Sequence, residues 1–477
     1  MFGILIVVLL FAALGAYLLT RSHAATPFIS VQPESGVVTG TAKVVTDTAA
    51  SGSKAITFAA PPPATGFVHP GITVGRTQLD FVKAKIAAGQ EPWKSAFTKL
   101  QTQGTAADGQ KVYSTSYVPH PVDIVKCATA GGKAYIAAHP ELTYLKEQGC
   151  SAQTDDAIAA YADALQWYYT GNPAYAQTAI KIMNAWSGTL TTIWFDQPRQ
   201  PSGAYIYGNG KLQAAWAGET ITRAAEIIRH TYTPAAGQET FNVPRFSTML
   251  NNVYLPLTID NWTDCCTNWL LSTTDATIAI GVFTDNKATF DNGIGDWRGQ
   301  VPAAIYLASD APKYPWVGNG PNPPPASNYD KPTGTYEYLR TGIWISAPNY
   351  VDGMEAEICR DFGHVVMGLE AMSYGAETAR LQGIDLWGEQ QTRIVKAYEF
   401  NTQYAIQQNA TGSVPTWLCN GQLKTTVLQL GFEIAYNHYH NRKGIAMPYT
   451  LQAVNKVRPT SSGLHMDYET LTSAGTP

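Results

Sequence analysis

The chain has 477 residues, enough for one large domain or for two or three ordinary ones. Its 45% hydrophobic content indicates a globular protein, and its net charge of −4 argues against a nucleic-acid-binding one. A polyanionic partner must therefore be bound by a local basic cluster and not by the field of the whole protein. The 12 Trp and 26 Tyr suit sugar binding, because aromatic faces stack on pyranose rings, although a large helical core also uses them.

Residues 2–19 form an unbroken run of apolar or small residues, which is followed by the polar stretch 20–25. This pattern predicts an export signal or an N-terminal membrane anchor over residues 1–25, and hence a secreted or extracytoplasmic protein. Ser22 and Ala24 fit the small-residue positions of a cleavage site, whereas the lack of Lys and Arg before the run speaks for an anchor. Both outcomes stay open.

Six cysteines in an exported chain suggest disulfides. Cys127 and Cys150 bracket a short loop-rich segment and are the first pair we expect. The others are Cys265, Cys266, Cys359 and Cys419, and the first two of these are adjacent and cannot easily bond each other. Six cysteines allow about fifteen complete pairings, among which the sequence does not choose. Because no Cys-x-x-Cys pair exists, we expect no structural zinc site, and we expect no metal or cofactor elsewhere.

Residues 26–60 predict a short β-rich segment, because 28–31, 42–45 and 55–58 have strand character and are separated by Gly/Ser/Thr turns. The pattern resembles a fragment of the β-sandwich carbohydrate-binding modules of exported bacterial enzymes, and a β-rich spacer explains it equally well. Residues 61–66 predict a stiff Pro-rich linker.

From residue 67 to residue 477 the signals are helical. The periodicity of apolar residues predicts helices over 155–170, 175–186, 212–229, 268–283, 357–382, 389–408 and 425–440. Paired helices joined by short polar turns are what a toroid of inner and outer helices requires, and a plain helical bundle has the same periodicity.

One stretch of this helical region concentrates charged residues. Glu357, Arg360, Asp361 and His364 are spaced i, i+3, i+4 and i+7, which on a helix places all four on one face. Apolar residues follow, so the helix is expected to be buried, where charges are costly unless paired. Such a row is either a functional site or an internal ion-pair network that fixes helix packing.

The run Glu-x-x-Arg-Asp-x-Gly-His over 357–364, together with 376–379 and 382–386, resembles the central motif of the alginate lyase superfamily. Residues 69–93 resemble the start of that domain, and 436–444 resemble its C-terminal motif. The resemblance implies a mainly α protein with an (α/α) toroid over 67–477. It also implies a polysaccharide lyase that cleaves an anionic uronic-acid polysaccharide, such as alginate or glucuronan, by β-elimination.

Such a lyase neutralises the C5 carboxylate, removes the C5 proton and protonates the leaving O4, with no need for a metal. By resemblance Asn268 is the neutraliser, and an ordinary helix N-cap is its structural alternative. The family often has His after this Asn, whereas this chain has Trp269. His364 therefore becomes the expected catalytic imidazole, with Asp361 or Glu357 setting its tautomer.

Arg360 is expected to hold the substrate carboxylate with two parallel hydrogen bonds. Tyr306 is the expected acid, because the segment 298–306 resembles a family segment with an Arg and a Tyr eight apart; Arg298 would lower its pKa. A core aromatic residue is the alternative for Tyr306. Tyr350 competes for its role, as do two tyrosines of a Pro- and Gly-rich region, 313–352, which suits a lid or cleft wall. The expected substrate-binding residues are Arg298, Glu357, Tyr336, Tyr338, His438, Tyr439 and Arg442.

Two other functions stay open. An (α/α)-barrel glycoside hydrolase would use two carboxylates such as Asp296 and Glu357. A surface polysaccharide-binding protein without activity would fit Trp269 in the place of His. We expect a monomer, and the sequence does not decide which uronan is bound or whether cleavage is internal or terminal.

Overall fold

Four long helices run in the same direction through the main body of the protein. They are α5 (Cys150–Thr170), α7 (Gly210–Thr231), α10 (Thr267–Phe283) and α13 (Phe362–Leu381). Near the starts of α7 and α10, Trp216 Nε1 donates to Ser272 Oγ at 3.1 Å, and near their ends Arg229 Nη1 donates to the carbonyl of Phe283 at 2.6 Å. These two helices are therefore parallel.

The neighbouring pairs α5–α7 and α10–α13 are parallel as well. Gln213 of α7 donates to Gln153 of α5 near the start of both helices, at 2.9 Å. On α13, Gly368 packs against Asn268 of α10 and Gly375 packs against Ile278. The N-terminal ends of all four helices consequently lie at one end of the domain.

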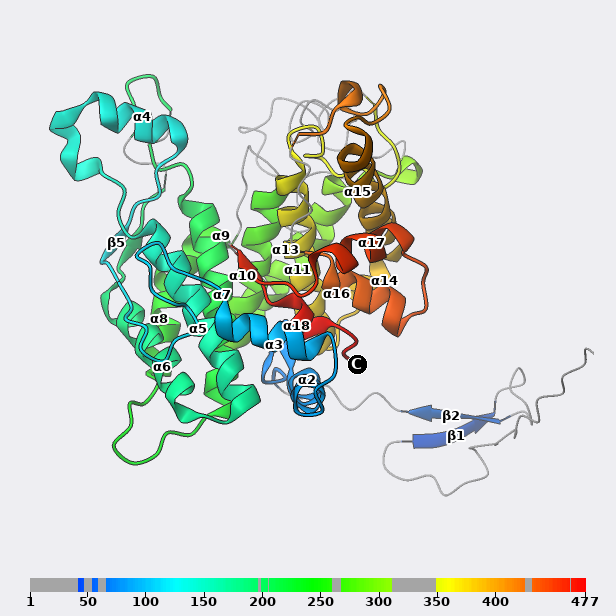
Figure 1. Cartoon of the computed structure of the whole chain (residues 1–477), viewed down its shortest axis with the longest axis horizontal. Coiled ribbons are helices and arrows are strands. Elements are labelled where there is room, and N and C mark those ends of the chain that lie inside the picture. The colour runs from blue at the N-terminus through cyan, green and yellow to red at the C-terminus, as the bar shows by residue number, and fades with distance from the viewer. Residues whose placement is uncertain are drawn as a thin grey trace, which may run out of the picture. The chain divides into compact units, whose positions relative to one another are not determined.

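Two of these inner helices are each followed by a helix that runs back along the domain. α6 (Pro173–Thr189) follows α5, and α11 (Lys287–Ala304) follows α10. Gly171 ends α5 at a φ of 71°, a left-handed conformation that favours glycine, and the Asn172 side chain caps α6. The protein is thus mainly α, with the (α/α) toroid that the resemblance implied (Figure 1).

This computed structural model describes residues 42–46, 54–58, 66–195, 199–204, 206–259, 267–310, 349–424, 431–463 and 465–477. Its other helices include α2 (Arg76–Ala87), α3 (Trp93–Thr102), α4 (Ala130–Ala138), η3 (Pro140–Leu145), α8 (Val243–Met249), η4 (Leu250–Tyr254), α9 (Leu255–Thr258), α14 (Leu386–Glu389), α15 (Gln391–Thr411), α16 (Glu433–Tyr436), η8 (Asn437–Arg442), α17 (Pro448–Val457) and α18 (Glu469–Ser473). Short strand pairs join β3 (Gly71–Ile72) to β4 (Val74–Gly75), β5 (Ile124–Val125) to β6 (Thr192–Ile193), and β7 (Ser462–Gly463) to β8 (Met466–Asp467).

The chain divides into two compact units, Met1–Gly66 and Phe67–Pro477. In the first, β1 (Ala42–Thr46) pairs antiparallel with β2 (Lys54–Phe58), so two of the three expected strands are confirmed. The third expected strand (28–31), the apolar run 2–19 and linker residues 61–65 lie outside the described residues. None of the described helices is both long and apolar enough to span a bilayer.

Two disulfides link described residues. Cys127 bonds Cys150, which confirms the expected pair, and Cys359 bonds Cys419 across a sequence separation of 60. Closing a loop of that length is worth about 4 kcal/mol in the chain-entropy account. We expect Cys359→Ser/Cys419→Ser to lower the melting temperature clearly, as measured by thermal unfolding. A melting temperature equal to that of the native protein would show that the bridge carries no stability.

Candidate active site

The charged row before α13 lies on a tight turn and not on a helix. The helix begins at Phe362, five residues later than the periodicity predicted, because Asp361 is its N-cap. Asp361 is extended, with φ −171° and ψ 156°, and its side chain accepts the backbone N–H of His364 at 3.1 Å. The turn still joins the row, since Arg360 Nη1 lies 2.8 Å from Glu357 Oε1 and the Arg360 N–H donates to the Glu357 carbonyl.

Glu357 anchors this turn to the start of α10. Its buried carboxylate accepts the backbone N–H of Asn268 at 2.8 Å and an N–H of the Arg360 guanidinium at 2.8 Å, and it lies 3.2 Å from the Thr267 hydroxyl. Both of its oxygens are committed to these contacts. That does not fit the free acid or base of a glycoside hydrolase, nor direct contact with substrate, so we assign Glu357 a positioning role.

Glu355 is the residue that the sequence reasoning missed. It is fully buried and accepts hydrogen bonds from the Thr267 hydroxyl and from the backbone N–H of Glu357. Burial and the neighbouring Glu357 carboxylate raise the pKa of Glu355 well above its ordinary value. Its signal was present in the sequence as a second acid two residues before Glu357, in the same motif.

His364 lies in the first turn of α13 and forms a dyad with Asp361. Its Nδ1 is 2.6 Å from Asp361 Oδ2, and both side chains are about one quarter exposed, at 26% and 24%. Burial would raise the pKa of Asp361, but the hydrogen bonds from the His364 ring and backbone outweigh it and lower that pKa. An ionised Asp361 holds the proton on Nδ1, which leaves Nε2 as the basic nitrogen. Asp361, and not Glu357, is therefore the tautomer-setting acid.

Asn268 lies at the start of α10 and faces α13. Gly368, one turn after His364 on the same face of α13, packs against the Asn268 backbone and Cβ. The Asn268 side chain is fully buried, and neither of its amide atoms has a hydrogen-bond partner within the described part of the chain. An unpaired buried amide is costly, so this side chain is not explained by its packing alone.

Tyr306 follows α11 and is joined to the same turn region by its backbone. Its N–H donates to the Met354 carbonyl at 2.9 Å, and its partly buried ring stacks on Tyr350 with centroids 5.6 Å apart. Arg298 instead forms a two-bond ion pair with Glu389, at 2.7 and 2.6 Å. The described contacts of the Arg298 guanidinium are thus to a carboxylate, and its predicted action on Tyr306 stays a prediction. Tyr336 and Tyr338 lie outside the described residues.

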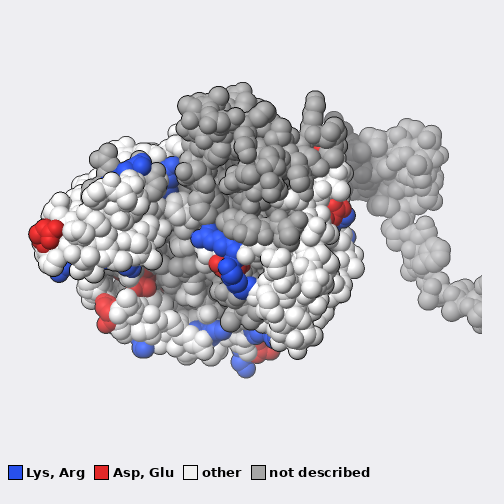
Figure 2. Space-filling model, turned by 90° about the horizontal axis from the view of Figure 1, so that it is seen from above, with Lys and Arg blue, Asp and Glu red and all other residues white. Residues whose placement is uncertain are grey.

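The structure thus links Asn268 and Arg360 through Glu357, places His364 in the turn of α13 that follows, and ties the Tyr306 backbone to Met354, just before the same turn. Figure 2 shows Lys and Arg atoms near the middle of the face seen from above, beside acidic atoms, so basic side chains gather locally despite the net charge of −4. The common N-terminal end of the inner helices adds partial positive charge, which favours anionic groups.

The C-terminal motif is directed into the protein. His438 is buried and stacks on Trp387 at 4.8 Å, and burial lowers its pKa to about 4. Tyr439 is fully buried and donates its hydroxyl to the Trp387 carbonyl at 2.8 Å. The predicted substrate contacts at His438 and Tyr439 do not fit this burial.

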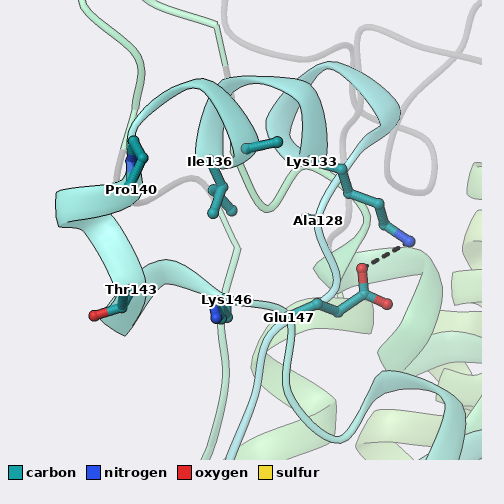
Figure 3. Close-up of a pocket in the computed structure, with 8 residues that line it drawn as sticks. Ala128, Lys133, Ile136, Pro140, Thr143, Lys146 and Glu147 are labelled. Carbon is teal, nitrogen blue, oxygen red and sulfur yellow. Dashed lines mark ion pairs between the residues drawn. The ribbon is translucent and has the colours of Figure 1, made fainter.

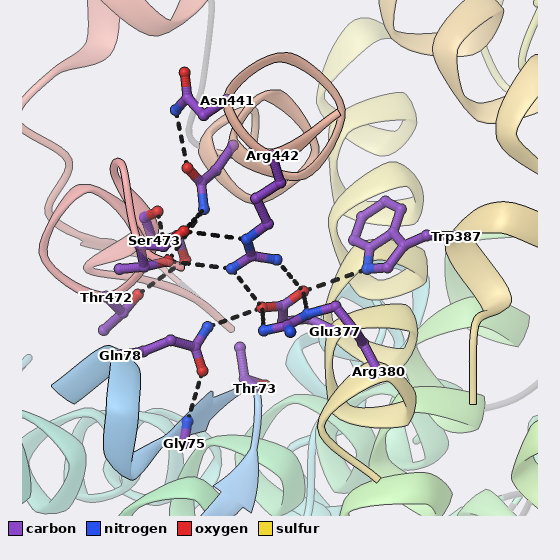
Figure 4. A network of polar contacts seen from close by, with 12 residues as sticks. Thr73, Gly75, Gln78, Glu377, Arg380, Trp387, Asn441, Arg442, Thr472 and Ser473 are labelled. Carbon is purple, nitrogen blue, oxygen red and sulfur yellow. Dashed lines mark hydrogen bonds and ion pairs between the residues drawn. The ribbon is translucent and has the colours of Figure 1, made fainter. Parts of the chain in front are cut away.

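Arg442 belongs to a structural network around Glu377 (Figure 4). The buried Glu377 carboxylate receives two hydrogen bonds from Arg442, both at 3.0 Å, and two from Arg380, at 3.0 and 2.8 Å. Gln78 of α2 and the indole of Trp387 complete it. Through this network Arg442 joins η8 to α13 and, by way of Glu377 and Gln78, to α2, and its predicted part in substrate binding stays a prediction.

A separate pocket of about 440 Å³ lies between α4 and η3 (Figure 3). Lys133 and Glu147 form an ion pair of 2.7 Å across it. Its lining residues include no histidine or tyrosine for acid–base chemistry: Ala128, Lys133, Ile136, Ala137, Pro140, Thr143, Lys146 and Glu147.

Comparison with known proteins agrees with the helical architecture. A family model described as alginate lyase matches residues 139–306, and no curated protein matches. A histidine-to-alanine variant of alginate lyase A1-III complexed with tetrasaccharide has a TM-score of 0.52 at 14% identity, covering 86% of this chain and 96% of that chain. A tyrosine-to-phenylalanine variant of the same enzyme with tetrasaccharide gives 0.52 and 14%, covering 87% and 99%.

An alginate lyase from Bacteroides ovatus is also similar, with a TM-score of 0.45 at 13% identity, covering 85% of this chain and 99% of that chain. At these identities the likeness to alginate lyase A1-III shows a shared fold. The match to the alginate lyase family model covers residues 139–306, a part of the chain that includes α10 and ends at Tyr306, and the domain shares the fold of the alginate lyase A1-III structures.

Proposed function

We propose that this protein cleaves a uronic-acid polymer of the alginate or glucuronan kind by β-elimination, at the site formed by Asn268, Tyr306, Arg360 and His364. The observation that carries the proposal is the buried, unpaired amide of Asn268 packed one turn from the His364–Asp361 dyad. An amide donor and an imidazole base at one place are what an elimination next to a carboxylate needs.

In this mechanism the C5 carboxylate of the substrate accepts hydrogen bonds from the Asn268 amide and from Arg360. Charge that develops on the carboxylate as the C5 proton leaves is stabilised by these donors. Of the two donors Asn268 and Arg360, only Arg360 is accessible, with a side chain that is 33% exposed.

His364 Nε2 takes the C5 proton, and Tyr306 gives its phenolic proton to the leaving O4. The C5–H and C4–O4 bonds break and a C4–C5 double bond forms, so the new non-reducing end is unsaturated and the other fragment keeps a hydroxyl. The Asp361 carboxylate stabilises the imidazolium that results. Each proton that leaves or arrives is thus held by a named side chain.

Incubation with alginate, glucuronan and other uronans, followed by ultraviolet absorbance, tests this proposal. We expect absorbance of the unsaturated product to rise with time on at least one uronan. New reducing ends without that absorbance would mean hydrolysis. Binding of the polymer with neither signal would indicate a polysaccharide-binding protein without activity.

The substrate is expected to be extracytoplasmic, as the N-terminal apolar run predicts an exported protein. We propose that the chain acts as a secreted or membrane-anchored monomer. Secretion of the full chain by a host, with sequencing of the N-terminus of the product, distinguishes a cleaved signal from an anchor.

A further inference from the structure

A second cluster of polar side chains lies at the opposite end of the toroid. His69 begins the helical domain, Glu226 and His230 lie one turn apart at the end of α7, and Asp285 follows the end of α10. The 17 residues of α10 span about 25 Å, and they separate this cluster from Asn268. The cluster is therefore distinct from the candidate active site.

Two buried atoms in this cluster have no hydrogen-bond partner among the described residues: Glu226 Oε2 and His230 Nε2. They face each other at 3.6 Å, which is too long for a hydrogen bond. Two ligands of one tetrahedral zinc ion, each at about 2.0–2.1 Å from the metal, lie about 3.4 Å apart. The spacing of these orphaned atoms therefore fits an ion between them.

His69 supplies a third donor, but its ring is stacked parallel on that of His230 with centroids 4.3 Å apart, so one ring must rotate for both to bind the same ion. Its Nδ1 lies 2.6 Å from Glu226 Oε1, and its Nε2 lies 3.0 Å from Asp285 Oδ1. The potential ligand atoms of His69, Glu226 and His230 all lie within 4.8 Å of one another. Metal-binding histidines usually donate their second ring N–H to a carboxylate, and Asp285, itself paired with Arg229 at 3.2 Å, is in that place.

A proton shared between His69 and the two acids is the simpler alternative. It would satisfy Glu226 Oε1 and Asp285, but it leaves Glu226 Oε2 and His230 Nε2 buried and unpaired. The separation of 3.6 Å between His230 Nε2 and Glu226 Oε2 is too long for a direct hydrogen bond to satisfy either atom.

We propose that His69, Glu226 and His230 bind a divalent transition-metal ion, and that zinc suits this set of two imidazoles and one carboxylate best. The sequence led us to expect no metal, because it has no Cys-x-x-Cys pair; His69 is 157 residues from Glu226, so local spacing does not indicate this set. The ion would tie the first segment of the domain to the end of α7, where the Gly71 N–H already donates to Glu226 at 3.0 Å. Its role is to stabilise the toroid, at a distance from the reaction.

The test uses the full chain without a histidine tag, treated with a chelator and dialysed. We expect about one equivalent of zinc to bind by calorimetry, and the melting temperature to rise by about 5 °C at a zinc concentration far above the dissociation constant. Cobalt(II) added in place of zinc is expected to give the visible absorption of a nitrogen- and oxygen-ligated ion.

Glu226→Gln and His230→Gln should abolish the rise in melting temperature and the cobalt spectrum, whereas the control His120→Gln, at a half-exposed histidine, should keep both. Absence of zinc binding and of the cobalt spectrum in the native protein would overturn the proposal, whether or not the variants fold. So would a zinc effect that persists in both variants, since the ion would then bind elsewhere.

Discussion

Replacement of His364 by alanine is expected to lower turnover on a uronan by about 10²–10⁴-fold, the usual loss for a general acid or base, while the domain stays folded. The fold should survive because Asp361 caps α13 through the backbone N–H of residue 364, which alanine retains. The ion pair that is lost is partly exposed and contributes little, about 0–1 kcal/mol.

Turnover and melting temperature, measured together for each variant, decide whether the charged residues from Glu357 to His364 act in catalysis or only stabilise the fold. His139→Ala is a matched control, since His139 is also partly buried and its Nδ1 is 2.7 Å from the carbonyl of Tyr135, at the end of α4. A folded His364→Ala protein with near-normal turnover would remove His364 from the mechanism. Tyr306 and Asn268 would then have to carry the elimination.

Arg360→Lys extends the same test. Lysine keeps the charge but cannot reproduce a planar guanidinium that contacts Glu357 and a carboxylate together, so we expect turnover to fall. If the row is only structural, turnover of the folded fraction should be preserved in both variants, and stability should fall instead, more for Arg360→Lys, whose partner Glu357 is buried, than for His364→Ala, whose pair with Asp361 is partly exposed.

Glu377→Gln is expected to destabilise the domain by about 3–5 kcal/mol at neutral pH, because it leaves Arg442 and Arg380 facing each other without a buried counter-charge. Burial alone would raise the pKa of Glu377, but Arg442 and Arg380 outweigh it and lower that pKa from 4.5 to about 2. A carboxyl with a lowered folded-state pKa stabilises the protein above its unfolded-state pKa.

The stabilisation from Glu377 is therefore complete above about pH 4.5 and is lost as the pH falls toward 2. This shift is worth about 3 kcal/mol. Chemical unfolding of the native protein and Glu377→Gln at several pH values should show their difference shrinking with acidity. Glu389→Gln is the control, as its ion pair with Arg298 is largely exposed and should change stability by less than about 1 kcal/mol. An equal difference between native protein and Glu377→Gln at pH 7 and pH 3 would refute the assignment.

The sequence predicted the long helices well where local signals were strong. The range 155–170 lies within α5, and 268–283 differs from α10 by one residue, because apolar periodicity and stop signals such as Gly171-Asn172-Pro173 act over a few residues. The start of α13 was wrong by five residues although a local signal existed, since Asp is a preferred N-cap and Asp361 takes that place. Glu357 and Arg360 are nevertheless in contact, because the backbone N–H groups of Arg360 and Asp361 both donate to the Glu357 carbonyl, as in a helical turn.

Periodicity was enough to predict a mainly α chain, because it is encoded within a few residues, whereas Asn268, Arg360 and His364 were proposed as site residues through the resemblance to a family and stay predictions. Tertiary structure decided what each charged side chain faces. His438 and Tyr439 are buried against Trp387. Arg298 and Arg442 form ion pairs with carboxylates of other elements, and His69 contacts Glu226. Burial and ion pairing depend on which helices pack against each other in the folded domain. A contact such as that of His69 with Glu226, which are 157 residues apart, produces no pattern in the local sequence.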